Sequence, residues 1–95
     1  MEISSTQNQI TITGNIKTVS DYQEIKTRID SVINQHKSIS LDIIDSISIT
    51  SSVIGYLTKI VMKDKIALST KVGNSQLLEL LDDLNLKATF KAKQA

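Results

Sequence analysis

Residues 47–57 have the sequence Ile47-Ser48-Ile49-Thr50-Ser51-Ser52-Val53-Ile54-Gly55-Tyr56-Leu57. The first three residues alternate apolar and polar, as in a β-strand, whereas the apolar residues from Val53 onward recur at helical spacing. Ser51 and Ser52 stand where the period changes, so the segment predicts the end of a strand followed directly by a helix. Hydroxyl side chains suit that position because they accept hydrogen bonds from the unpaired N–H groups of a first helical turn.

Before this segment the apolar pattern predicts two strands, a helix and a further strand. Residues 9–13 alternate apolar and polar, residues 2–6 are a weaker candidate for a partner strand, and Gly14-Asn15 marks a hairpin turn or exit loop. Apolar residues at helical spacing predict a helix over residues 20–35. Ser20 and Gln23 have the spacing of a capping box at its start, and Asp21 adds an acid to its first turn.

The clearest strand follows that helix. Ile39, Leu41 and Ile43 alternate with polar residues. Ile44 interrupts the alternation, which favours burial on both faces, as in a central strand. After residues 47–57 we expect a short strand at residues 66–68.

The C-terminal part begins with a loop and cap at residues 73–75. A leucine-rich helix follows from Leu77 to Leu84, with Asn85 as a left-handed stop. We expect a final strand at residues 88–90 and a frayed tail at residues 90–95.

This order of elements predicts one α/β domain over residues 1–95. Helices that alternate with short apolar strands indicate a mostly parallel mixed β-sheet with right-handed crossovers. The N-terminal hairpin contributes an antiparallel strand, and about three main α-helices complete the domain.

Composition excludes several function classes. The formal net charge of the 95 residues is +1 at pH 7, which argues against a nucleic-acid binder that relies on a basic face. The chain has no cysteine, and therefore no disulfide, no thiol nucleophile and no thiolate metal site. The N-terminus lacks a signal-peptide pattern, and no segment approaches the ~20 apolar residues of a membrane span. We therefore expect a cytoplasmic protein that does not insert into a membrane.

Four short motifs resemble a known family. These are Thr13-Gly14 at an early turn, Leu41-Asp42 in a strand, residues 50–55 before a helix, and the leucine-rich residues 77–86. The segment from Ile39 to Phe90 resembles a STAS domain, the family of anti-sigma-factor antagonists and of the cytoplasmic tails of sulfate transporters. The family motif before the helix is Asp-Ser-Ser-Gly-Leu-Gly, so Thr50 replaces its Asp and Val53 its first Gly.

The resemblance implies a STAS-like fold and a non-enzymatic module for partner switching in signal transduction and transcription regulation. In the antagonists, the first serine of the pair is phosphorylated by a kinase that is also the anti-sigma factor, and a phosphatase resets it. That serine corresponds to Ser51. The alternative is an accessory subunit of a lipid or anion transporter ATPase complex that is not phosphorylated, towards which the substitutions at Thr50 and Val53 shift the balance.

Physical reasoning leaves both a functional and a structural role open for the serines. A phosphate on Ser51 would meet free N–H donors and the positive end of the helix dipole, yet Ser51 and Ser52 can equally be helix caps, and Ser52 fits a cap better than a phosphate acceptor. We expect an exposed surface for a protein partner that is made by Thr50, Ser52, Tyr56, Lys59 and Lys63.

The remaining polar residues point to no further site. Asp42 and Asp45 fit a solvated rim or a turn better than a metal site, and His36 is the only histidine, so no catalytic triad is available. Gly55 permits a close contact of its helix with a partner or with the sheet, and close internal packing is the favoured interpretation. We therefore expect no catalytic residue, no metal and no cofactor; the oligomeric state is not indicated.

Overall fold

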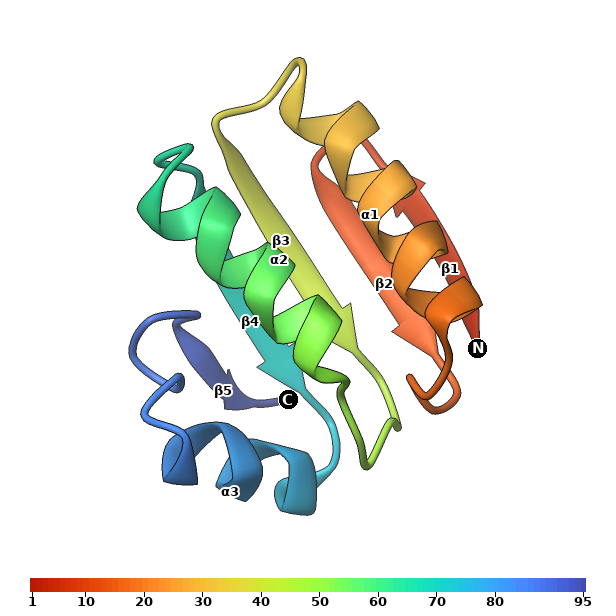
Figure 1. The fold of residues 1–95 in the computed structure, drawn as a ribbon, viewed down its shortest axis with the longest axis vertical. Coiled ribbons are helices and arrows are strands. Elements are labelled where there is room, and N and C mark those ends of the chain that lie inside the picture. Colours follow the sequence, from red (N-terminus) through yellow and green to blue (C-terminus); the bar gives the residue numbers. More distant parts are fainter.

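A computed structural model describes residues 1–95 and has the predicted α/β architecture (Figure 1). The elements follow one another in the predicted order. They are β1 (Glu2–Thr6), β2 (Gln9–Thr13), α1 (Val19–Ile33), β3 (Ser38–Ile43), α2 (Ser51–Met62), β4 (Ala67–Val72), α3 (Ser75–Asp83) and β5 (Ala92–Gln94).

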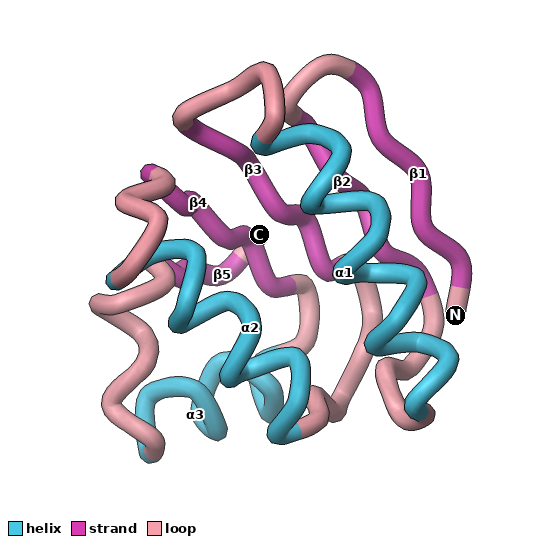
Figure 2. The backbone as a smooth tube through the Cα atoms, turned by 45° about the horizontal axis from the view of Figure 1, so that its top comes forward, coloured by secondary structure: helices cyan, strands magenta, loops and turns pink.

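The five strands form one mixed sheet in the order β1-β2-β3-β4-β5. β1 is antiparallel to β2, and all other neighbours are parallel, as predicted. Each crossover advances by one strand in the same direction. Because such crossovers are right-handed, the helices lie on one face of the sheet, with α1 and α2 side by side across it (Figures 1 and 2).

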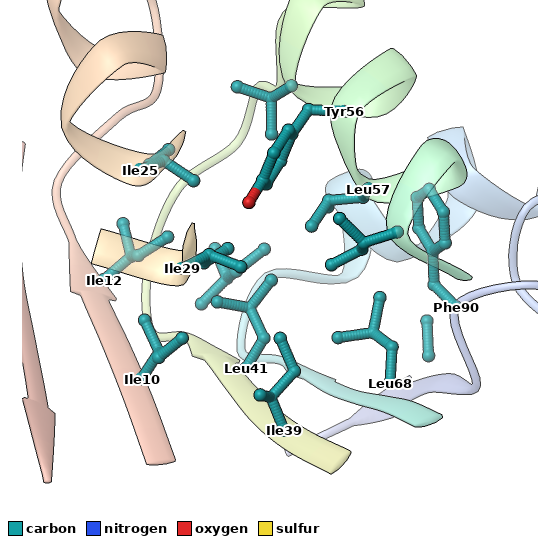
Figure 3. Close-up of a cluster of buried hydrophobic side chains, with 14 of the residues drawn as sticks. Ile10, Ile12, Ile25, Ile29, Ile39, Leu41, Tyr56, Leu57, Leu68 and Phe90 are labelled. Carbon is teal, nitrogen blue, oxygen red and sulfur yellow. The ribbon is translucent and has the colours of Figure 1, made fainter. Parts of the chain in front are cut away.

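The core lies between the sheet and these helices (Figure 3). Alternate strand residues point toward the helices, and the apolar helix residues that face the sheet are spaced three and four positions apart. Twenty buried hydrophobic residues form this cluster. Its fully buried members include Ile10, Ile12, Ile25, Ile29, Ile39, Leu41, Ile43, Leu57, Ile60 and Leu77.

The opposite face of the sheet is polar. Most strand residues that alternate with the core positions are hydroxyl-bearing or charged (Gln9 and Ala67 are the exceptions), and they are half-buried or exposed. Asp42 lies opposite Lys71 in the register between β3 and β4. A largely parallel sheet is usually covered on both faces; here the uncovered face is polar, which accounts for the clear apolar–polar alternation of the strands.

The N-terminal turns differ from the prediction in detail. The hairpin turn between β1 and β2 is Gln7-Asn8, with Gln7 at a φ of 54°, so Gly14-Asn15 is the exit loop of the two alternatives. The capping box of α1 is formed by Thr18 and Asp21 and not by Ser20 and Gln23. Helix α1 therefore begins at Val19 and ends at Ile33, close to the predicted limits.

Two apolar stretches that were predicted to lie in strands are not strands. Residues 44–50 form a loop in which Ile44 is 42% exposed and Ile47 is 51% exposed, so the predicted burial on both faces of the strand is wrong. The central position of that strand, β3, is confirmed. Residues 88–90 form turns, because the Phe90 N–H bonds to the Leu86 carbonyl oxygen at 2.9 Å and the ring is buried in the core.

The C-terminal end is a strand and not a frayed tail. Ala92–Gln94 pair in parallel with Thr70–Val72 as β5. The Gln94 side-chain amide also donates to the Gly73 carbonyl oxygen at 2.9 Å, which ties this strand to the loop after β4. As predicted, Asn85 is left-handed after α3, with a φ of 60°.

Candidate functional site

Helix α2 begins at Ser51, and its N-cap is Thr50. The Thr50 hydroxyl accepts a hydrogen bond from the Val53 N–H at 3.3 Å. The cap interpretation of Ser51 and Ser52 is therefore wrong, because the residue before them has that role. A threonine oxygen is an adequate N-cap acceptor, so the residue that departs from the STAS motif still starts the helix.

The two serines are exposed on the first turn of α2. Neither their N–H groups nor their hydroxyl groups take part in a hydrogen bond within the chain. The first turn also contains no acidic residue. The positive end of the helix dipole therefore faces solvent with no negative side chain of its own beside it.

A network of hydrogen bonds fixes the loop that precedes α2. The Asp45 carboxylate accepts from the Gly14 N–H at 2.7 Å, and the Asn15 side-chain oxygen accepts from the Ile47 N–H at 3.0 Å. Ser46 is fully buried, and its hydroxyl accepts from the Ile16 N–H at 3.0 Å and donates to the Ser48 carbonyl oxygen at 2.7 Å. These bonds hold residues 45–48, which precede α2, against residues 14–16, which follow β2. Asp45 thus has the turn role that was favoured over metal binding.

Gly73 holds the same loop from the other side. Its N–H donates to the Ile43 carbonyl oxygen at 2.9 Å. A Cβ atom at this position would lie 1.9 Å from the Ile44 carbonyl oxygen, so no other residue fits without movement of the backbone. The loop before α2 is therefore clamped between the loops that follow β2 and β4.

Helix α2 has one buried and one accessible face. Its buried residues Val53, Leu57 and Ile60 pack into the core, as the predicted apolar stripe requires. The accessible face, which we call the α2 ridge, follows the spacing i, i+3, i+4, i+7 and i+11 from Ser51. It consists of the exposed residues Ser51, Gly55 and Met62 and the half-buried residues Ile54 and Thr58; Ile54 also packs against the core, and Met62 is 62% exposed. Ser51 lies at the N-terminal end of this ridge.

Tyr56 is buried, which corrects its predicted place on an exposed surface. Its ring points inward between α1 and α2 (Figure 3), and the residue is only 5% exposed. The hydroxyl donates to the Asp30 carboxylate at 2.5 Å. Lys26 pairs with the other Asp30 oxygen at 2.8 Å and lies 5.6 Å from the Tyr56 ring centroid.

This cluster of Tyr56, Asp30 and Lys26 joins the two helices electrostatically. Burial, and then the hydrogen bond to Asp30, raises the pKa of Tyr56 well above its ordinary value, so the phenol stays protonated. Burial raises the pKa of Asp30, but the hydrogen bonds from Lys26 and Tyr56 outweigh it and leave the pKa below its ordinary value. Asp30 was not singled out from the sequence, because its partner is 26 residues away.

The two lysines of the predicted surface lie away from the serines. Lys59 pairs with Asp64 at 3.3 Å, and Lys63 is the exposed C-cap of α2. Lys63 follows Ser51 by twelve positions, a distance of about 18 Å along the helix axis. The structure thus brings Thr50, Ser51 and Ser52 together, whereas Lys59 and Lys63 lie toward the other end of the helix.

Gly55 does not serve close internal packing, so that interpretation is wrong. The residue is exposed, and a Cβ atom there would meet no atom within 4 Å. A glycine inside a helix costs about 1 kcal/mol relative to alanine. No contact within the domain that needs a glycine offsets this loss of helix stability. Gly55 lies one turn after Ser51 on the α2 ridge.

The largest hollow of the surface is not at Ser51. It is a groove of about 440 Å³ between β1 and α1. No group of three or more His, Cys, Asp or Glu side chains is arranged to hold a metal ion, and none of the helices is long and apolar enough to cross a membrane. Asp42 lies in β3, and His36 lies in the connection between α1 and β3.

Comparison with known proteins finds no match: no family model, no curated protein and no solved structure corresponds to this chain. The geometry of the first turn of α2 is therefore the basis on which a function is proposed.

Proposed function

We propose that this chain is a non-enzymatic regulatory module that binds a serine-kinase anti-sigma factor and is switched by phosphorylation of Ser51. The observation that carries the proposal is the position of Ser51. Its hydroxyl is free and exposed at the first residue of α2, on a turn that lacks an acidic side chain. The module resembles a STAS-type anti-sigma-factor antagonist in its motifs and in its order of strands and helices.

The phosphorylation step adds a group that the site can hold without rearrangement. The kinase transfers the γ-phosphoryl group of ATP to the Ser51 oxygen, the hydroxyl proton is lost and ADP leaves; a phosphatase hydrolyses the ester. The new group carries about −1.5 to −2 charge at neutral pH. The N–H groups of the first turn and the helix dipole favour that charge, so the domain stays folded while its surface changes.

The α2 ridge is the surface on which the partner would sit. Ile54 and Met62 supply apolar contact, and Gly55 offers a place without a side chain where a partner's backbone can approach closely. Ile47, 51% exposed in the preceding loop, extends the apolar contact beyond Ser51. A phosphate at one end of this ridge would oppose docking by its bulk and by the cost of removing its charge from water.

A transporter-associated role is the second candidate, and one observation favours it. Thr50 caps α2 through a neutral hydroxyl, whereas the STAS motif of the phosphorylated antagonists has a carboxylate at this position. In this alternative the chain binds the ATPase of a lipid or anion transporter complex through the same ridge, and Ser51 is not modified.

A capture experiment with matched variants separates the two candidates. Wild-type protein, Ser51→Glu and Ser75→Glu are immobilised and exposed to extract of the cells that produce the protein. Ser75 is the matched control because it is the exposed first residue of α3. The proposal predicts that a serine-kinase anti-sigma factor binds the wild type and Ser75→Glu but is lost with Ser51→Glu.

The opposite result is equally clear. Capture of a transporter ATPase by all three proteins would overturn the switch and support the alternative. Capture of a kinase that does not distinguish Ser51→Glu from Ser75→Glu would also overturn regulation at Ser51. Circular dichroism of the variants confirms that each keeps the fold.

A further inference from the structure

The outer edge of β1 is an unprotected strand edge. β1 pairs with β2 on one side only and forms one end of the five-stranded sheet. Natural sheets blunt such edges with proline, inward-pointing charge, bulges or covering segments. β1 reads Glu2-Ile3-Ser4-Ser5-Thr6, with no proline and a single charge at its first residue, and its pairing with β2 runs without a bulge.

The hairpin register shows which backbone groups are free at this edge. Thr6 and Gln9 flank a two-residue turn, so they form a hydrogen-bonded pair, and Ser4 with Thr11 is the next such pair. The N–H and C=O groups of Ile3 and Ser5 therefore point away from β2. Their side chains lie on the helix-covered side of the sheet, since they face Ile12 and Ile10 in the register.

The groove beside this edge carries charges of both signs. It has a volume of about 440 Å³ and is lined by Ile3, Ser20, Gln23, Glu24, Thr27 and Arg28. Arg28 is anchored near one end of the edge, where its guanidinium donates to the Ser5 hydroxyl at 3.3 Å. Glu24 lies one helical turn before Arg28 on the same side of α1.

We propose that two copies of this chain form a dimer by antiparallel pairing of their β1 edges, with Ser4 on the two-fold axis. In this register Ile3 of each copy lies opposite Ser5 of the other, so the free backbone groups satisfy one another in hydrogen-bonded pairs. The arrangement is self-complementary, as a two-fold interface must be.

The same symmetry makes the charges complementary. Arg28 stands beside Ser5, and Ser5 faces Ile3 of the second copy, whose groove contains Glu24. Each Arg28 therefore comes opposite a Glu24 across the axis. A second copy is a better occupant than an unrelated strand, because only a copy in this register repeats both the backbone and the charge pairing.

An edge-to-edge contact of one short strand is small, so we expect a weak dimer that forms between micromolar and millimolar protein concentration. The test is sedimentation equilibrium over that range, at low and high salt. The wild type should show a reversible monomer–dimer equilibrium that salt weakens.

Two sets of variants probe the interface separately. Ser5→Pro removes an outward N–H without removing a bond to β2, and it should abolish the dimer. Glu24→Arg and Arg28→Glu should each weaken association about tenfold or more, whereas the double variant should restore it. Glu79→Lys, an exposed charge reversal on α3, is the control and should change nothing.

Each outcome decides the proposal. A monomer at every concentration overturns it, and so does a dimer that persists in Ser5→Pro and in both single charge reversals. If circular dichroism shows that Ser5→Pro is unfolded, the charge-reversal set still decides, because rescue by the double variant requires the two charges to meet across copies.

Discussion

The N-termini of α1 and α2 have the same kind of cap but differ in the charge of their first turn. Each has a threonine cap: Thr18 accepts from the Asp21 N–H at 3.0 Å, and Thr50 accepts from the Val53 N–H at 3.3 Å. In α1 the Asp21 carboxylate then accepts from the N–H groups of Lys17 and Thr18 at 2.9 and 3.1 Å. In α2 no acid occupies the first turn.

The difference shows what a helix start can be used for. α1 supplies its own anion, so its end of the dipole is already compensated. In α2 the positive end of the dipole has no such side chain, so a bound anion or a covalent modification could compensate it. Both helices pack on the same sheet with similar buried stripes, so the contrast lies in local polar chemistry and not in the fold.

The largest expected loss of stability comes from Gly73, which holds the loop before α2 in place. Gly73→Ala forces a Cβ atom into the Ile44 carbonyl oxygen, and we expect it to destabilise the domain by about 2–4 kcal/mol. Urea unfolding followed by circular dichroism measures the loss. Gly55→Ala is the matched control, because its Cβ meets open space and should stabilise α2 by up to about 1 kcal/mol. Equal stability of the two variants would contradict the clamp.

The two threonine caps should be of similar strength. Thr50→Ala and Thr18→Ala each leave one first-turn N–H group without its acceptor, and each should cost about 1 kcal/mol of unfolding free energy. Thermal or urea unfolding of the two variants is the measurement. If Thr50→Ala left the unfolding free energy unchanged and Ser52→Ala lowered it, Ser52 and not Thr50 would be the N-cap of α2.

An added carboxylate should make α2 resemble α1. Ser52→Asp places an acid in the first turn of α2 and should raise the unfolding free energy by about 0.3–1 kcal/mol at low salt. High salt should reduce the gain, which a urea series at two ionic strengths would show. Ser31→Asp, an exposed serine in the last turns of α1, is the control and should be neutral or destabilising. A loss of stability in Ser52→Asp would mean that the α2 end is not electropositive.

The smallest expected effect is the pH dependence of the stability that Asp21 gives to α1. Hydrogen bonds from the Lys17 and Thr18 N–H groups lower the pKa of Asp21 below its ordinary value of 3.8. A lowered folded-state pKa gives stability that is present above the unfolded pKa and is lost as pH falls through the folded pKa. The advantage of wild type over Asp21→Asn should therefore shrink below about pH 4. Unfolding curves at several pH values measure it, and an advantage that grows in acid would contradict the cap.

Periodicity predicted the order of elements, because alternation and helical spacing report which side of each element is buried. The direction of the strands followed from that order, since helices that alternate with strands connect parallel neighbours. Periodicity failed where tertiary partners decide. Ile47 and Ile49 alternate like a strand, yet the Ile47 N–H donates to the Asn15 side-chain oxygen and the Ser48 N–H to the Ser46 hydroxyl, which hold that segment as a loop. The final strand was displaced from residues 88–90 to Ala92–Gln94, because Phe90 enters the core from a turn.

The candidate site was predicted in part. The position of Ser51 at the start of a helix followed from the change of period and is correct. The cap was assigned one or two residues too late, since threonine and serine are both good acceptors and the sequence does not reveal which has the extended backbone. Tyr56 borders the apolar stripe, but its ring is part of the buried core and its hydroxyl donates to Asp30 on another helix, a partner that the sequence pattern does not reveal.

The most direct test of the central claim is the modification state of Ser51 in protein purified from the cells that make it. Intact mass and phosphopeptide mapping should find one phosphoryl group on Ser51 in part of the wild-type population and none on Ser52 or Ser75. The Ser51→Ala variant should carry no phosphate. A protein that is unmodified under every growth condition, or phosphorylated only elsewhere, would contradict the account and leave α2 with an uncompensated but unused N-terminus.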